Sequence, residues 1–223
     1  MGERLSFDAV IFDADGTLFD TEALMYEVWV EIGRDMGLTM TIPEYLHYVG
    51  LNRKAVLDVM RERIGPDFDG ADFMVRCVAR LSERIEEEGV PLKPGVREIL
   101  ELLRQKGIPV GLATSTHRVR TDRRLELCGL GEYFSAVVTG DEVSKGKPDP
   151  EIYRLACQTL GTDPARTLAV EDSRNGILSA TAAGMPTVMI PDMIPPTPEL
   201  EALLCQRCES LWELQNILSS LSV

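Results

Sequence analysis

Histidine is nearly absent from this sequence, since only His47 and His117 occur among its 223 residues. Protein zinc sites draw mainly on histidine and cysteine, so this supply disfavours zinc. The five cysteines are an odd number, and only Cys205 and Cys208 lie close together. One such pair without neighbouring cysteines or histidines is weak evidence for a metal, and we expect reduced, partly buried thiols.

Long apolar runs and an excess of positive charge are also missing. No run approaches the ~18 apolar residues of a membrane-spanning helix, and no basic-then-apolar leader opens the sequence, so we expect a cytoplasmic protein without a membrane partner. Asp and Glu outnumber Lys and Arg by 36 to 23, which gives a formal net charge of −13. This balance disfavours nucleic acid as a partner, and an anionic substrate would need local positive groups. Nothing indicates an oligomer interface, and we expect a monomer.

The sequence does contain a regular alternation of short apolar runs and helical patterns. The apolar runs have the length and composition of buried parallel strands and lie at 9–12, 109–113, 136–139, 167–170 and 187–190. Helical patterns precede or separate the last four, at 97–106, 118–128, 150–160 and 173–183. This alternation predicts an α/β fold, a Rossmann-like doubly wound parallel sheet with helices on both faces.

The stretch after the first strand breaks this rhythm. It holds three helical patterns and no strand pattern, with the helices expected at 22–36, 53–64 and 72–88. We therefore predict a small helical cap domain, residues 18–90, inserted into a core domain of residues 1–17 and 91–223. The chain returns to the core through PLKPGV, whose two prolines and glycine suit a stiff connector.

Polar side chains follow the predicted strands. In an open parallel sheet the carboxyl ends of the strands share one edge, where ligands bind. The residues predicted to converge at this edge are Asp13, Asp15, Thr114, Glu171 and Asp172. Clustered carboxylates repel one another and need a cation to stay ionised, and an all-oxygen donor set favours Mg²⁺.

A fixed cation is also expected near this edge. Lys147, in the segment SKGKPDP, is the best placed lysine, and Lys145 is its nearest rival. Carboxylates, Mg²⁺, a lysine and a hydroxyl are the components of phosphoryl transfer, in which one carboxylate can attack phosphorus in line.

Four motifs, in this order and spacing, resemble the haloacid dehalogenase superfamily, in particular its β-phosphoglucomutase-like and sugar-phosphatase branch. They are DADGT at 13–17, LATST at 112–116, GKPDP at 146–150 and VEDSRNG at 170–176. The resemblance covers nearly the whole chain. It implies a Mg²⁺-dependent phosphatase that acts on a small phosphorylated metabolite, a sugar or polyol monophosphate, through an aspartyl-phosphate intermediate.

The resemblance also implies a role for each motif residue. Asp13 is the expected nucleophile, and Asp15 is the expected general acid and base. Thr114 is expected to bind the phosphate, and Lys147 to steady both the nucleophile and the phosphate. The expected metal ligands are Asp13, the backbone carbonyl of Asp15, Asp172 and Glu171.

Further substrate contacts are expected beside Thr114 and in the cap. Ser115 is a second candidate for the phosphate, although both hydroxyls could also cap the following helix. The segment GLNR at 50–53 occupies the place where caps of this family present a loop to the substrate, which makes Gly50, Asn52 and Arg53 candidates. The guanidinium of Arg53 offers a fixed fork of donors, and the alternative is an ordinary surface arginine.

Two alternative functions are a phosphosugar mutase and a phospho-accepting signalling domain. Mutases of the β-phosphoglucomutase type resemble this chain but usually carry a histidine where Met25 stands, and methionine cannot relay a proton. A phospho-accepting signalling domain also gathers acids, a threonine and a lysine at its strand ends. Such domains are uncapped and place the phosphorylated aspartate on a later strand, whereas Asp13 follows the first.

Two features lack a firm role in this interpretation. For Asp20 we expect a helix cap or a hinge contact. For the basic run HRVRTDRR at 117–124 we expect a solvated helix face, and the alternative is attraction of an anionic substrate.

Overall fold

The computed structural model describes residues 7–51 and 53–220, and the chain divides into two compact units. One unit is formed by Met1–Phe19 and Leu92–Val223 and the other by Asp20–Pro91. Leu18 and Phe19, which the sequence analysis assigns to the cap, lie in the first unit, where both are fully buried. Within the described residues, every helix is too short or too polar to cross a membrane.

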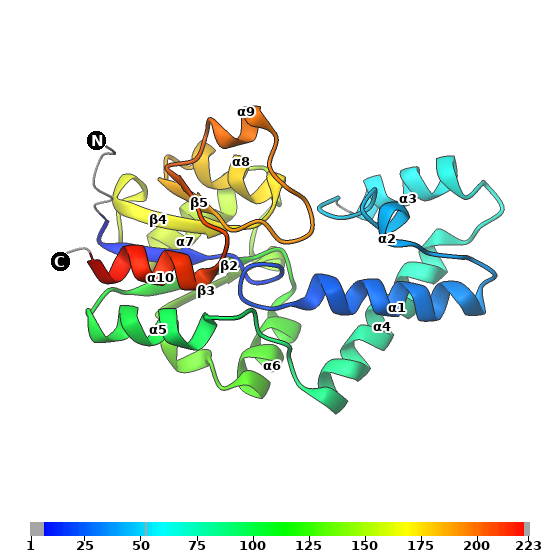
Figure 1. Cartoon of the computed structure of the whole chain (residues 1–223), viewed down its shortest axis with the longest axis horizontal. Coiled ribbons are helices and arrows are strands. Elements are labelled where there is room, and N and C mark those ends of the chain that lie inside the picture. The colour runs from blue at the N-terminus through cyan, green and yellow to red at the C-terminus, as the bar shows by residue number, and fades with distance from the viewer. Residues whose placement is uncertain (1–6, 52, 221–223) are drawn as a thin grey trace. The chain divides into compact units, whose positions relative to one another are not determined.

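The first unit is an α/β unit built on a six-stranded parallel sheet (Figure 1). Its strands are β1 (Ala9–Phe12), β2 (Val110–Thr114), β3 (Ala136–Thr139), β4 (Thr167–Glu171), β5 (Thr187–Met189) and β6 (Gln206–Arg207). The spatial order is β3-β2-β1-β4-β5-β6, so the direction of winding reverses between β1 and β4. Ile11 pairs with Gly111 on one side and Ala169 on the other, which sets the register.

The helices of the α/β unit lie between its strands or, for the last one, after the final strand. They are α5 (Val96–Gln105), α6 (Arg118–Cys128), α7 (Glu151–Leu160), α8 (Arg174–Ala182), α9 (Pro198–Glu201) and α10 (Leu211–Ser220). Short 3₁₀ turns lie at η1 (Gly131–Tyr133), η2 (Gly140–Glu142) and η3 (Pro164–Arg166). Right-handed crossovers that run in opposite directions along a sheet place their helices on opposite faces. This rule puts α5 and α6 on one face and α7 and α8 on the other (Figure 1).

The core of this unit explains why the first strand is apolar throughout. All four residues of β1 are buried, because the strand lies between two others and has helices on both faces. On one face Ile11 and Ala113 belong to the same cluster as Ile152 and Tyr153 of α7. Strands of this kind read as continuous apolar runs, which is why the sequence pattern locates β1 and β3 to the residue.

The second unit, Asp20–Pro91, is helical. It contains α1 (Thr21–Asp35), α2 (Ile42–Tyr45), α3 (Arg53–Arg63) and α4 (Gly70–Glu88). Its interior is aromatic: the ring of Trp29 lies 5.0 Å from those of Tyr45, Tyr48 and Phe73, centroid to centroid. The pairs with Tyr45 and Phe73 are edge-to-face, an arrangement that adds to the free energy gained by burial.

Asp20 stands at the N-cap position of α1, but its side chain makes no capping hydrogen bond to the helix. Of the two roles expected for Asp20, the side-chain cap is not formed, and the hinge contact stays a prediction. The backbone N–H of Asp20 donates to the carbonyl oxygen of Pro91 over 2.9 Å, so the first and last residues of the helical unit are tied together.

Candidate active site

Asp13 is the first residue beyond β1, at the point where the winding of the sheet reverses. Ligands of open α/β sheets bind at such a point, outside the carboxyl ends of the strands. The backbone N–H of Asp13 donates to the carbonyl oxygen of Val170 over 2.9 Å, which fixes it beside the end of β4. Only 7% of the residue is exposed.

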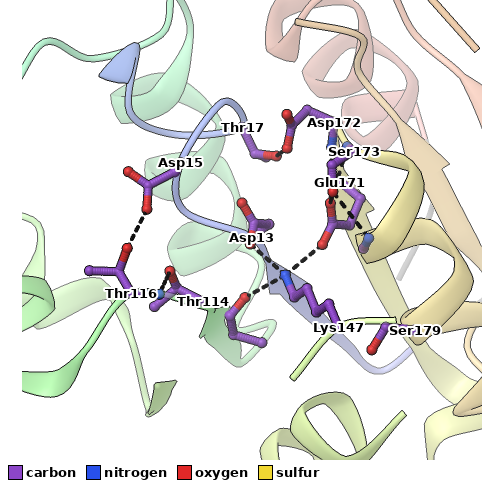
Figure 2. Close-up of polar contacts among 12 residues, drawn as sticks. Asp13, Asp15, Thr17, Thr114, Thr116, Lys147, Glu171, Asp172, Ser173 and Ser179 are labelled. Atoms are coloured by element: carbon purple, nitrogen blue, oxygen red, sulfur yellow. Dashed lines mark hydrogen bonds and ion pairs between the residues drawn. The ribbon is translucent and has the colours of Figure 1, made fainter. Parts of the chain in front are cut away.

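Lys147 lies at the centre of the site, in the loop that precedes α7 (Figure 2). Its Nζ donates to Asp13 Oδ1 over 2.5 Å, to Glu171 Oε1 over 2.6 Å and to the carbonyl oxygen of Ala113 over 3.0 Å. The side chain is 6% exposed, whereas Lys145 is 73% exposed and lies 3.9 Å from Asp149. The structure therefore selects Lys147 as the fixed cation of the site.

Burial and charge act against each other in this cluster. Burial raises the pKa of Asp13 to about 8. The positive charge of Lys147 lowers this pKa in part, and the like charge of Glu171 raises it further. Burial by itself lowers the pKa of Lys147, but the charges of Asp13 and Glu171 outweigh it and raise that pKa. Lys147 thus stays positively charged, and Asp13 needs a further cation to be fully ionised near neutral pH.

Glu171, the last residue of β4, is fully buried and held on both oxygens. The hydroxyl of Tyr153 donates to Oε1 over 2.7 Å, and the hydroxyl of Ser173 donates to Oε2 over 3.1 Å. A Cβ atom at Gly176 would lie 1.9 Å from Oε1, so glycine is needed there for the helix α8 to pass so close to the carboxylate. The carboxylate of Glu171 is thus locked toward Lys147.

Asp172 completes the acidic group. The hydroxyl of Thr17 donates to its Oδ1 over 3.1 Å, which joins the loop after β1 to the end of β4. Gly16 has a φ of +85°, and a Cβ atom there would lie 2.3 Å from Oδ2 of Asp172. Both the backbone conformation and the close approach therefore require glycine at this position.

Carboxylate oxygens of Asp13, Glu171 and Asp172 lie within 4.8 Å of one another. Two of these carboxylates, Asp13 and Glu171, contact the ammonium of Lys147, and the donor atoms of all three are oxygen. A hard divalent cation such as Mg²⁺ or Ca²⁺ takes ligands of this type, so these residues can hold a divalent metal. The backbone carbonyl of Asp15 stays a predicted ligand.

The second strand brings hydroxyl groups to the same edge. Thr114 ends β2 and is 1% exposed, and its Oγ1 accepts the N–H of Thr116 over 3.1 Å. Ser115 is exposed. The N-cap residue of helix α6 is His117, so the alternative that Thr114 or Ser115 caps this helix does not hold. The structure places both residues at the sheet edge, and their binding of phosphate stays a prediction.

Asp15 directs its carboxylate toward Thr116, on the other side of the loop from Lys147 (Figure 2). Its Oδ2 accepts the hydroxyl of Thr116 over 2.7 Å, and its Oδ1 accepts Nη1 of Arg124 over 2.5 Å. Arg124 is buried, with 7% of the residue exposed. The expected solvated face for the run 117–124 is therefore wrong at its last residue.

Arg124, Tyr153 and Thr17 belong to the site but were not predicted from the sequence. A signal for the first was available: Thr121, Leu125 and Cys128 form the buried stripe of α6, and Arg124 falls on that stripe. Tyr153 likewise lies on the buried stripe of α7. Thr17 belongs to the DADGT motif itself, but its bond to Asp172 spans 155 positions.

The predicted cap contacts lie in the other unit. Gly50 and Arg53 are exposed residues of the helical unit, and Asn52 lies outside the described residues. Arg53 is the first residue of α3. Their contact with a substrate stays a prediction.

Comparisons with known proteins agree with this geometry. The model of the haloacid dehalogenase-like hydrolase family matches residues 10–190. A phosphorylated carbohydrates phosphatase of Thermotoga maritima is 35% identical over 178 residues, which cover 80% of this chain and 82% of that protein. Hexitol phosphatase B of Escherichia coli K12 is 33% identical over 190 residues, which cover 82% and 83%.

A solved structure leads to the same family. The crystal structure of a candidate β-phosphoglucomutase from Thermotoga maritima superposes with a TM-score of 0.79 at 31% identity, covering 96% of this chain and all (100%) of that one. The family match spans most of the chain, and two relatives above 30% identity are named as phosphatases. The chain therefore belongs to the haloacid dehalogenase-like hydrolase family, as one of its phosphatases.

Proposed function

We propose that this enzyme is a Mg²⁺-dependent phosphatase that hydrolyses a sugar or polyol monophosphate through an aspartyl phosphate on Asp13. The observation that carries the proposal is the buried contact of Asp13 with Lys147, beside the carboxylates of Glu171 and Asp172 at the switch point of the sheet. Two relatives support the substrate class by their names: one is a phosphorylated carbohydrates phosphatase and the other is a hexitol phosphatase.

In the first step the Asp13 carboxylate attacks phosphorus in line with the ester oxygen. The bond between Asp13 and phosphorus forms, the bond to the leaving oxygen breaks, and Asp15 donates the proton that the leaving oxygen needs. Lys147 stays charged and orients Asp13 while Thr114 donates to a phosphate oxygen.

In the second step Asp15 takes a proton from water as the water attacks the phosphorus. The acyl phosphate bond breaks, inorganic phosphate leaves, and Asp13 is restored. Asp13, Glu171 and Asp172 would hold the Mg²⁺, which when bound supplies positive charge to the phosphate oxygens and keeps the carboxylates ionised.

The helical unit is proposed to act as the cap that gives the enzyme its substrate selectivity. Gly50 and Arg53 are exposed residues of this unit, and the guanidinium of Arg53 is a group that binds hydroxyls and anions. Met25, half-buried in α1, cannot transfer a proton, and this favours hydrolysis over a mutase reaction.

The covalent step is tested by trapping the intermediate. The enzyme is mixed with p-nitrophenyl phosphate and Mg²⁺, quenched in acid and reduced with borohydride, which converts an aspartyl phosphate to homoserine. Peptide mapping should then find homoserine at position 13. The control is Asp20→Asn, which changes a neighbouring carboxylate outside the mechanism. This variant should give homoserine at position 13 as the wild type does. Phosphate release without any homoserine at position 13 would contradict the covalent route.

The substrate class and the metal are tested with a panel. Glucitol 6-phosphate, glucose 6-phosphate and glycolate phosphate are assayed for phosphate release with Mg²⁺ and with EDTA. The expected result is release from a sugar or polyol phosphate only with the metal. Conversion of β-glucose 1-phosphate to glucose 6-phosphate without net release would identify a mutase instead.

A further inference from the structure

Helix α6 carries a charged residue on the side that faces the interior. Thr121, Leu125 and Cys128 are buried at helical spacing, and Arg124 lies among them with 7% of the residue exposed. Burying a guanidinium away from water is costly unless a charged or polar partner compensates it. The position therefore calls for a specific partner.

That partner is Asp15, which lies 109 positions earlier in the sequence. Nη1 of Arg124 donates to Oδ1 of Asp15 over 2.5 Å, and the side chains are 8% and 25% exposed. The neighbouring Arg123 instead has a 45% exposed side chain and pairs with Glu126 of its own helix. Of these two adjacent arginines, Arg123 pairs with a residue of its own helix, and Arg124 pairs with Asp15 of the site.

The other oxygen of Asp15 has a partner of a different kind. The hydroxyl of Thr116 donates to Oδ2 over 2.7 Å, and Figure 2 shows the carboxylate directed toward it. A hydroxyl can both donate and accept, so Thr116 can stay bonded to Oδ2 whether or not that oxygen carries a proton. A guanidinium can only donate, so Arg124 stays on Oδ1.

We propose that Arg124 is a positioning residue, which anchors Oδ1 of Asp15 so that Oδ2 is the oxygen that exchanges the proton with the leaving group and with water. This inference rests on the proposed function. A charge-assisted bond in a largely dry setting holds the carboxyl in one orientation before the substrate arrives. Preorganisation of this kind contributes to rate because proton transfer depends on the placement of the reacting atoms.

The test compares Arg124→Met, Arg124→Lys and the matched control Arg123→Met in the full-length enzyme with Mg²⁺. Glucitol 6-phosphate has a poor leaving group whose departure needs the proton, whereas p-nitrophenolate leaves without one. Arg124→Met should lower kcat for glucitol 6-phosphate about 10- to 100-fold and change KM by less than about 2-fold. Arg124→Lys should recover part of this loss, and Arg123→Met should behave like the wild type.

A pre-steady-state burst separates positioning from structural damage. With p-nitrophenyl phosphate, the burst of p-nitrophenol should keep its wild-type rate in Arg124→Met, while the later steady state slows because Asp15 must still activate water. A purely structural lesion would slow both phases equally and would overturn the inference. If Arg124→Met fails to fold, the same ratio of burst to steady state is measured in Arg124→Lys.

Two further outcomes have distinct meanings. Wild-type values of kcat in Arg124→Met, or values above them, would refute the positioning role while leaving the phosphatase proposal intact. A wild-type enzyme that releases phosphate from neither compound would refute the proposed function, and the inference would fall with it.

Discussion

Lys147 in the α/β unit and Arg63 in the helical unit both pair with carboxylates, but their surroundings differ. The side chain of Lys147 is 6% exposed, and its partners Asp13 and Glu171 are buried as well. The side chain of Arg63 is 38% exposed, and it binds both oxygens of Glu44 near the surface. Water screens the second pair and leaves it a small stabilising effect, whereas the first is costly to assemble and costly to disrupt.

The same contrast extends to how each unit buries its interior. In the α/β unit, polar groups gather at the carboxyl ends of apolar strands, where the backbone direction brings them together. In the helical unit, aromatic rings fill the centre and ion pairs run along the outside of the helices α1 and α4, such as Arg84 with Glu27 and Arg80 with Glu31. The α/β unit therefore buries charged groups at its strand ends, whereas the two ion pairs named in the helical unit involve exposed glutamates.

Asp13→Asn should give the largest effect. The amide cannot act as the nucleophile, so phosphate release should fall about 10⁴-fold or more. The folded state should survive, because a pKa of about 8 leaves the Asp13 carboxyl mostly protonated near neutral pH without the metal, and the amide of Asn has nearly the same shape. Phosphate release is measured with Mg²⁺, and thermal unfolding without it. Turnover near the wild-type level would contradict the mechanism, and loss of the folded state would contradict the electrostatic argument.

Lys147→Met tests the buried pair of the comparison. The change leaves Asp13 and Glu171 without their common cation, so the free energy of unfolding should fall by about 3–5 kcal/mol. Urea unfolding without metal measures the loss. Lys145→Met, the exposed lysine two positions earlier, is the control and should change stability by about 0.5 kcal/mol at most.

Phe73→Leu tests the aromatic interior of the helical unit. Phe73 is fully buried and lies edge-on to Trp29, so the change should reduce stability by about 1–2 kcal/mol. Hydrogen exchange should show the loss in residues 20–91, with protection of the parallel sheet unchanged. Equal loss of protection in β1 and β4 would mean that the two units unfold together.

Arg63→Met should have the smallest effect, about 1 kcal/mol or less at pH 7. The hydrogen bond from Arg63 holds the pKa of Glu44 below its ordinary value of 4.5. A depressed pKa stabilises the folded state above the ordinary value, and this stabilisation is lost as the pH falls through the lower, folded-state value. The difference between wild type and variant should therefore shrink below pH 4.5. If the difference in stability between wild type and variant grew below pH 4.5, the argument from the lowered pKa of Glu44 would be contradicted.

Much of the fold could be predicted because its signals are local. Buried parallel strands are apolar over their whole length, which located β1 and β3 to the residue and the others to within one residue at either end. Strand β6, Gln206–Arg207, carries two polar residues and no such signal. It exists because Gln206 pairs with Val188 at the edge of the sheet.

The residues of the site likewise include some that were predicted from the sequence and some that only the folded chain identifies. The convergence of Asp13, Glu171 and Asp172 was predicted because they follow strands and chain direction alone brings strand ends to one edge. Lys147 was predicted separately, from the segment between the third and fourth strands. Lys147 was already preferred to Lys145 from its place in the sequence, and the folded chain adds that the side chain of Lys147 is buried whereas that of Lys145 is exposed.

Sequence by itself therefore specified the parallel α/β core, the helical insertion and the acids and lysine of the site, since periodicity and motif order are local properties. The order β3-β2-β1-β4-β5-β6 and the burial of Arg124 came from contacts between distant segments. An arginine in a basic run looks like a solvated residue until its partner is known, and Asp15 lies 109 positions away. The cost of burying a charge depends on that partner, and only the packed chain brings the two together.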